Sequence, residues 1–217
     1  VALLQLRIFD CPWDEPLGLD AAVRVQMAYG VFREVFEELQ IPGSDGQPQP
    51  ELISRSGHNI EPGVIENALL KHPEVMLCAA VSKPDAYAGE LPIAYVQTVK
   101  GAKVTSAELL AFAAQHVPER PAAPKEVVLV DAMPLTDVEK PDKVKLRYDA
   151  AERAFAEVFN EALGSGIPIS VKAGSDESQA MVITANIQCD SGARGSIEKT
   201  IGEIMKSYIH RHQINWI

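Results

Sequence analysis

A run of hydrogen-bond donors at residues 55–59 is the first part of this sequence that could do chemistry. It reads RSGHN and follows a short apolar run, Leu52 and Ile53. Gly57 can adopt a positive φ or let another group approach the backbone closely. The side chains around it carry guanidinium, hydroxyl, imidazole and amide donors. The composition indicates either a binding loop or a structural turn, and by itself it favours the turn.

A lysine provides the second candidate. Lys140 is followed by Pro141, which favours an exposed, non-helical segment around the lysine. An ammonium group on a flexible stem is a movable point charge that can meet a developing anion. Taken alone, however, a lysine is usually a solvated surface group. The neighbouring Lys143 and Lys145 could pair with Glu139 or could be solvated only.

Three segments resemble motifs of the acyl-adenylate-forming enzymes, the AMP-dependent synthetase and ligase superfamily, and fatty-acyl-CoA synthetases most of all. In chain order they are SRSGHNIEPGVIE at residues 54–66, KPDAYAGELP at residues 83–92 and MPLTDVEKPDKVKLR at residues 133–147. The last resembles the family pattern LPLTxVGKxxKxxLR. The resemblance covers residues 51–150 and, more weakly, the tail to residue 217. It identifies the chain as similar to the small C-terminal lid domain of these enzymes.

The resemblance implies a role for each motif. Lys140 matches the family's catalytic lysine, which bridges the substrate carboxylate and the α-phosphate of ATP as charge builds up in adenylation. Gly57, with Ser56 and His58, matches the loop that faces the active site during thioester formation, where a glycine leaves a passage for the pantetheine arm of CoA. His58 is expected to position groups by hydrogen bonding rather than to act as a base.

Arg55 has two readings, because its guanidinium could bind a CoA phosphate or form a structural ion pair with Glu61 or Glu66. Asp85, Gly89 and Glu90 are expected to be turn architecture.

The sequence also departs from the family pattern. Glu139 stands where a glycine usually precedes the lysine, which restricts φ and adds a carboxylate beside the reacting charges. Pro50 occupies the position of the hinge lysine or aspartate about which the lid swings. The large N-terminal adenylation domain, with its ATP-binding loop, is not matched by any segment of this sequence.

The expected function is therefore the lid portion of an acyl-CoA synthetase, which adenylates a carboxylate with ATP and then transfers it to CoA. ATP with Mg and CoA are the cofactors expected of the complete enzyme, with an acyl substrate and the large adenylation domain as partners. The chain alone is expected to be an inactive fragment of a fatty acid–CoA ligase. The alternative is a non-catalytic binding or assembly module derived from the lid.

The pattern of elements predicts an α+β fold. Apolar runs predict strands at residues 75–81, 91–99 and 126–130, which form a small three-stranded sheet with packed helices. Pro62 suits the first turn of a helix over residues 61–71, and Thr105 with Glu108 forms a capping box for the next helix. A long helix over residues 147–163 ends at the glycines that follow it. Beyond it a second small ββαβ layer is predicted, with strands at 168–172 and 180–188, a helix at 196–209 and an edge strand at 214–217.

This reading divides the chain into three regions. Residues 1–50 form a divergent or truncated N-terminal segment, with a strand at 3–8, a helix at 19–39 and a linker rich in proline and glycine at 42–50. Residues 51–150 form the AMP-binding enzyme C-terminal domain. Residues 151–217 form a C-terminal α/β extension.

Composition excludes several classes of function. The net charge is −10 without a cluster of lysine and arginine, so no nucleic-acid partner is expected. The 3 cysteines, Cys11, Cys78 and Cys189, are far apart, which favours a reducing cytoplasmic compartment. No apolar run approaches the roughly 20 residues that a transmembrane helix needs. His210, His212 and Cys189 lack the spacing of a zinc site, so no metal site is predicted.

Overall fold

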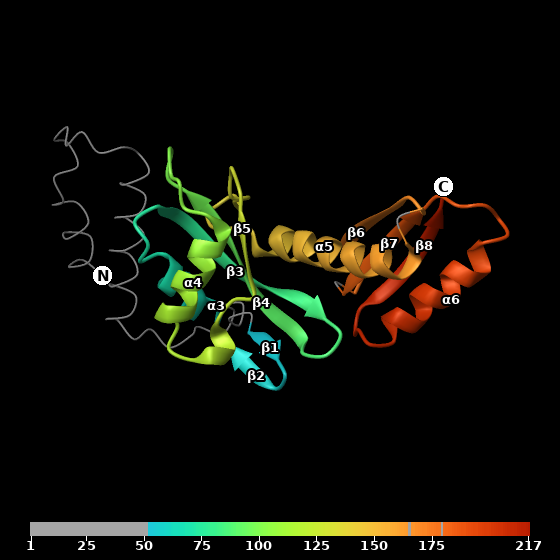
Figure 1. The fold of residues 1–217 in the computed structure, drawn as a ribbon, viewed down its shortest axis with the longest axis horizontal. Coiled ribbons are helices and arrows are strands. Elements are labelled where there is room, and N and C mark those ends of the chain that lie inside the picture. Colours follow the sequence, from blue (N-terminus) through green and yellow to red (C-terminus); the bar gives the residue numbers. More distant parts are fainter. Residues whose placement is uncertain (1–51, 165, 179) are drawn as a thin grey trace. The chain divides into compact units, whose positions relative to one another are not determined.

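The computed structural model describes residues 52–164, 166–178 and 180–217. The described residues all belong to one compact unit, Pro48–Ile217. The predictions for residues 1–50, including the hinge position Pro50, lie outside the described residues. Figure 1 shows two sheets joined by the long helix α5.

The first sheet is five-stranded. Its strands are β1 (Ile53–Arg55), β2 (His58–Ile60), β3 (Val75–Asp85), β4 (Gly89–Thr98) and β5 (Glu126–Leu129). The order is β2-β1-β4-β3, with antiparallel pairing, and β5 pairs with β4 in parallel. The predicted strands are present as β3, β4 and β5, and the sheet gains β1 and β2 from the segment that was expected to be a loop.

Helices cover both faces of this sheet. Along β4, Ala94 and Val96 belong to one cluster with helices α3 (Pro62–Leu69) and α4 (Ser106–His116). Ile93 and Tyr95, which alternate with them, belong to another cluster with α5 (Lys143–Leu163). This alternation follows from the two-residue period of a strand. The central strands are therefore buried on both faces, which explains their nearly continuous apolar sequence.

The predicted helix boundaries are largely confirmed. Pro62 is at the start of α3, and the Thr105–Glu108 capping box is formed in full at the start of α4. Because α5 begins at Lys143, the long helix starts earlier than the predicted residue 147. It ends at Leu163, and Gly164 follows with a φ of 79°. The short 3₁₀ helix η1 (Arg120–Ala122) lies between α4 and β5.

The second sheet confirms the predicted ββαβ layer, although its helix ends at Met205 rather than residue 209 and its last strand begins at Arg211 rather than residue 214. It contains β6 (Ile169–Ser175), β7 (Met181–Ile187) and β8 (Arg211–Trp216), in that order, and α6 (Arg194–Met205) connects β7 to β8. β7 and β8 are parallel, so the connection between them needs a crossover such as this helix. Phe155 and Phe159 of α5 pack here with Ile183 and Ile201.

Helix α5 belongs to both hydrophobic cores. Leu146 and Ala150 pack with the first sheet, whereas Phe155 and Phe159 pack with the second. The predicted boundary between residues 150 and 151 therefore falls within one continuous helix, and the division into two domains stays a prediction. Among the described residues, no helix combines the length and apolar character needed to cross a bilayer.

Candidate functional site

The segment at residues 55–59 is a tight β-hairpin rather than an irregular loop. β1 and β2 pair in the register Ile53↔Ile60 and Arg55↔His58, which leaves Ser56 and Gly57 as the turn. Both turn residues have positive φ, 48° and 83°, as a type I′ turn requires. The backbone of this segment is therefore a regular turn, as its composition favoured. Sequence patterns missed the strands because each is only 3 residues long.

The β3–β4 turn supports this hairpin. Asp85 accepts hydrogen bonds from the backbone N–H groups of Tyr87 and Ala88, at 3.0 and 2.7 Å. The backbone N–H of Ser56 donates to the carbonyl oxygen of Ala88 at 2.9 Å. The Glu90 carboxylate accepts from the backbone N–H of Ser54 at 2.7 Å. Asp85 and Glu90 therefore act as turn architecture, as the sequence indicated.

An open cleft of about 500 Å³ lies beside the hairpin. Its lining residues are Arg55, Ser56, His58, Arg120, Pro121 and Lys125. Nη1 of Arg55 donates to the carbonyl oxygen of Pro121 at 2.8 Å, which orients the guanidinium toward η1. The expected alternative of an ion pair with Glu66 is not what forms, because the Glu66 carboxylate meets Lys143 instead.

The chemistry of this cleft favours an anion. Two arginines and one lysine line it, together with an imidazole that can donate a hydrogen bond. Arg120 and Lys125 were not predicted, because η1 and β5 reach the hairpin only through the fold. A periodic pattern in the sequence could not have revealed them.

Lys140 is exposed, as predicted, and lies outside regular secondary structure, in the connection from β5 to α5. Its backbone is closed into a loop, because Leu135 and Pro141 form an antiparallel bridge. The N–H of Thr136 donates to the carbonyl oxygen of Lys140 at 2.8 Å, and the N–H of Lys140 donates to the Thr136 hydroxyl at 3.3 Å. The backbone of Lys140 is therefore held while its ammonium group is available to a ligand.

Glu139 has a left-handed backbone, with a φ of 59°. This is the conformation that a glycine would adopt without strain, and a side chain there costs about 1–2 kcal/mol. The loop therefore keeps the shape that suits glycine, although this chain has a glutamate at that position.

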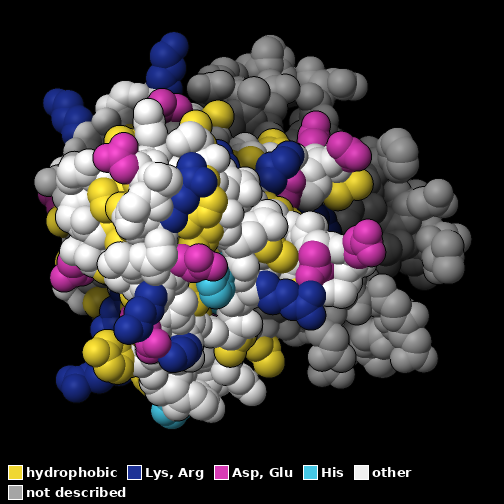
Figure 2. Space-filling view, turned by 90° about the vertical axis from the view of Figure 1, so that its right-hand side faces the viewer, with side chains coloured by type: hydrophobic (Ala, Val, Ile, Leu, Met, Phe, Trp, Pro, Cys, Tyr) yellow, Lys and Arg dark blue, Asp and Glu magenta, His cyan; other side chains and the backbone are white. Residues whose placement is uncertain are grey.

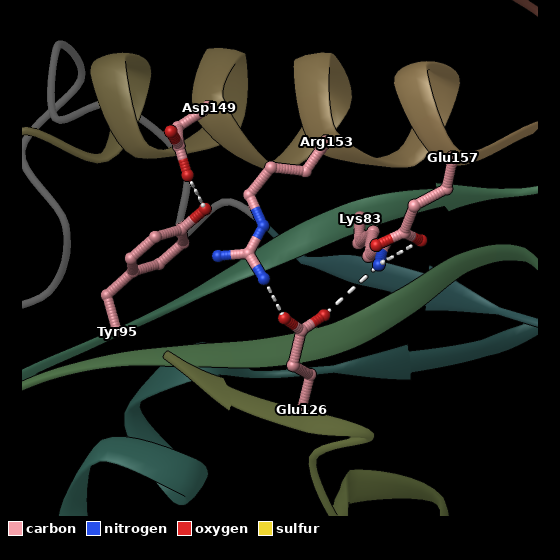
Figure 3. A network of polar contacts seen from close by, with 6 residues as sticks. All are labelled: Lys83, Tyr95, Glu126, Asp149, Arg153 and Glu157. Atoms are coloured by element: carbon pink, nitrogen blue, oxygen red, sulfur yellow. Dashed lines mark hydrogen bonds and ion pairs between the residues drawn. The ribbon is translucent and has the colours of Figure 1, made fainter. Parts of the chain in front are cut away.

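Helix α5, which follows Lys140, is anchored to the first sheet by a polar network (Figure 3). The Tyr95 hydroxyl donates to the Asp149 carboxylate at 2.6 Å, and burial raises the pKa of Tyr95. Glu126 of β5 pairs with Arg153 and, at 3.1 Å, with Lys83. The start of the helix is also capped, since Asp142 accepts from the N–H of Lys145, which lowers the pKa of Asp142.

The lysines that follow Lys140 have defined partners. Lys143 pairs with Glu66 at 2.6 Å, and Lys145 pairs with Asp142 at 3.2 Å. These partners come from α3 and from the cap of α5, so neither lysine is merely solvated.

Comparison with known proteins identifies this region. The sequence profile of the AMP-binding enzyme C-terminal domain matches residues 64–140. These residues belong to that family. The match ends at Lys140 and begins after the Gly57 hairpin.

Proteins similar to this chain include CoA ligases. Marinolic acid–CoA ligase from Pseudoalteromonas sp. is 38% identical over 138 residues, which are 64% of this chain and 21% of that protein. An uncharacterized acyl–CoA ligase, YtcI, from Bacillus subtilis is 37% identical over 45% of this chain and 19% of its own length. A solved acyl-CoA synthetase from Brucella canis is 33% identical over 49% of this chain and 20% of that chain, with a TM-score of 0.45. The chain thus spans about a fifth of the length of the relatives it matches.

In the part of the chain that the structure describes, the candidate residues fall into two groups. Arg55, Ser56 and His58 line the basic cleft, with Gly57 at the turn beside them. Lys140 does not line that cleft and comes from a different connection. Among the described residues, no group of His, Cys, Asp and Glu side chains could hold a metal ion. The face seen in Figure 2 shows charged side chains of both signs intermingled, without a large basic patch.

Proposed function

We propose that this chain supplies the C-terminal domain of an acyl-CoA synthetase, which adenylates a carboxylic acid with ATP and transfers the acyl group to CoA. The observation that carries the proposal is the lysine loop. Lys140 has an exposed ammonium group on a closed backbone that is anchored through α5. A fixed positive charge stabilises the anion that develops in a transition state without later reorganisation. Lys140 would meet the substrate carboxylate and the α-phosphate of ATP, which is bound with Mg.

The basic cleft supports the second half-reaction. CoA carries phosphates, and the guanidinium groups of Arg55 and Arg120 are suited to bind them, with Lys125 as an additional charge. The Ser56–Gly57 turn borders the same cleft. A Cβ added at Gly57 would meet no atom of the described residues within 4 Å, its two chain neighbours aside, so the space beside Gly57 is open to a ligand such as the pantetheine arm.

The chain needs a partner domain for this chemistry. Phosphates and adenine of ATP are usually held by a glycine-rich loop and its surroundings, and no segment of this sequence matches such a loop. We therefore assign ATP and acyl recognition to a large N-terminal adenylation domain, and we place the reaction in the cytoplasm. The isolated chain should show no ATP–pyrophosphate exchange with fatty acids.

A chimera tests the proposal. Residues 52–217 would replace the matching C-terminal part of marinolic acid–CoA ligase, and the two half-reactions would be assayed separately. We expect adenylation and thioester formation, with adenylation lost in the Lys140→Ala chimera. A folded chimera that binds ATP but adenylates no faster than the large domain alone would contradict the proposal.

Glu139 favours a second candidate, a non-catalytic binding module derived from the lid. It places a strained residue and a negative charge directly before Lys140. In that case the purified chain would bind CoA in the basic cleft, and the wild-type and Lys140→Ala chimeras would have equal adenylation rates. Calorimetric titration of the chain with CoA, beside the chimera assay, separates the two functions.

A further inference from the structure

The partly buried carboxylate of Glu66 connects helix α3, which follows the Gly57 hairpin, to helix α5, which follows Lys140. Glu66 lies in α3, and its Oε1 atom is 2.6 Å from Nζ of Lys143, the first residue of α5. The same Oε1 accepts a hydrogen bond from the backbone N–H of Ala80 in β3, at 2.9 Å. Glu66 therefore joins α3, β3 and α5 at one point.

This pair is less exposed than the pair of Lys206 with Glu203. The side chains of Lys143 and Glu66 are 32% and 20% exposed, whereas those of Lys206, directly after α6, and Glu203, in α6, are 69% and 59% exposed. The buried thiol of Cys78 is close to both charges, and burial, with Glu66 nearby, raises its pKa. Screening by water and salt is weaker for partly buried charges, so this contact should restrain its partners more than a surface pair does.

The restraint is close to Lys140 along the chain. Only Pro141 and Asp142 separate Lys140 from Lys143, so the two Cα atoms can lie no more than roughly 11 Å apart. Pro141 is itself held by its bridge to Leu135, and the N–H of Asp142 donates to the carbonyl oxygen of Pro134 at 2.8 Å. A shift of Lys143 would therefore be transmitted to the backbone of the lysine loop.

We infer that Glu66 and Lys143 are positioning residues that hold the Lys140 loop in place and tie it to α3, the helix that directly follows the Gly57 hairpin. Neither side chain needs to touch the reacting atoms. For catalysis the inference rests on the proposed function of Lys140, whereas the restraint on the loop can be measured independently of it.

The direct test is amide hydrogen exchange on the full 217-residue chain. In Lys143→Met, the amides of Thr136 and Asp142, which bond within the lysine loop, should exchange roughly five- to tenfold faster than in the wild type. Amides of β6 and β7 should be unchanged. Lys143→Arg, which keeps the charge, should retain slow exchange. Lys206→Met is the matched control, because it removes a 2.7 Å ion pair at the C-terminal end of α6, and it should not affect the loop.

A second variant keeps the test decisive if Lys143→Met folds poorly. Glu66→Gln removes the negative charge but keeps an oxygen that can accept from the Ala80 N–H, and it should speed exchange at the same two amides. Unchanged exchange in Glu66→Gln and in folded Lys143→Met would overturn the inference.

Activity in the chimera distinguishes this inference from the proposed function. Lys143→Met should lower kcat for adenylation roughly tenfold, with little change in KM for ATP and rescue by Lys143→Arg. If the loop amides exchange faster but Lys140→Ala adenylates normally, the proposed function fails while the restraint on the loop is established. If Lys140→Ala is inactive and Lys143→Met keeps both slow exchange and full kcat, the positioning role is wrong.

Discussion

The hairpin that carries Gly57 and the loop that carries Lys140 show two ways of holding a residue in the left-handed conformation. Ser56 and Glu139 are the only non-glycine residues with positive φ in the part of the chain that the structure describes, and each lies in one of these two turns. In the hairpin, strand pairing on both sides requires this conformation. In the lysine loop, a bridge, a proline and a helix cap hold it.

The difference concerns what each turn offers to a ligand. The hairpin offers open space at Gly57, bordered by the fixed charges of the cleft. The lysine loop offers one charge on a flexible stem, whose backbone is restrained by neighbours that do not enter the site. Substitutions in the hairpin should therefore act mainly through size, and substitutions in the lysine loop mainly through charge.

The largest effect should come from removing the charge. In the chimera, Lys140→Ala should lower adenylation by about a hundred- to a thousandfold, because one preorganised charge at a developing anion contributes about 3–4 kcal/mol. Thioester formation from supplied acyl-adenylate should remain, since that step displaces AMP and uses the hairpin. Separate assays of the two half-reactions provide the measurement. Equal loss in both would show that the two turns act in one pose.

Filling the open space should have the next largest effect, in the opposite half-reaction. Gly57→Leu should slow thioester formation by up to about a hundredfold by blocking the approach of the pantetheine arm, and it should spare adenylation. Gly101→Leu is a matched control, because Gly101 also has a positive φ, 84°, and free space around it.

Both glycine variants should lose about 1–2 kcal/mol of unfolding free energy from the left-handed backbone alone. If Gly101→Leu slowed thioester formation equally, the loss at Gly57 would reflect stability rather than the passage.

The basic cleft should contribute a smaller effect, on affinity. Arg120→Gln should raise KM for CoA by roughly three- to tenfold, because it removes one exposed charge from a phosphate site. KM for pantetheine, which lacks these phosphates, should not change. Lys71→Gln, an exposed lysine beyond the end of α3, is the control for net charge. A similar rise in KM for pantetheine would place Arg120 outside the phosphate site.

The sequence predicts the long elements of this fold and the exposed lysine loop. Strands β3 and β4 can be predicted because their apolar runs are long. Helix α4 can be predicted because Thr105 and Glu108 form a capping box that is visible in the sequence. Strands β1 and β2 are too short for any periodic pattern, so pairing in three dimensions determines them.

The candidate sites show the same limit. Lys140 and Gly57 are recognisable from the residues around them, whereas Arg120 and Lys125 join the cleft only because η1 and β5 return beside the hairpin. The partner of Lys143 likewise depends on the fold, because α3 and α5 both contact β3, and Glu66 lies 2.6 Å from Lys143 although the two are 77 positions apart in sequence.

The smallest predicted effect is on unfolding free energy, and it comes from substitutions at Glu139 that distinguish backbone strain from charge. Glu139→Gly should relieve the left-handed backbone, with a gain of up to about 1 kcal/mol in unfolding free energy after the extra chain entropy of glycine is counted. Ser56→Gly, at the other strained position, should give a similar gain. Glu139→Gln should not give this gain, because it keeps a side chain on the left-handed backbone. Urea unfolding of the 217-residue chain measures all three.

The adenylation rates of the same variants in the chimera should follow a different order from their unfolding free energies. Glu139→Gln and Glu139→Gly both remove a carboxylate adjacent in sequence to Lys140, and both should raise the rate roughly two- to fivefold, since an exposed pair of unit charges interacts by about 1 kcal/mol. Ser56→Gly should leave the rate unchanged, because Ser56 belongs to the turn beside the cleft. If Glu139→Gly raised the rate and Glu139→Gln did not, backbone strain rather than charge would limit the lysine loop. In that case the Gly57 hairpin and the Lys140 loop would be alike, because backbone conformation rather than side-chain charge would determine the function of each.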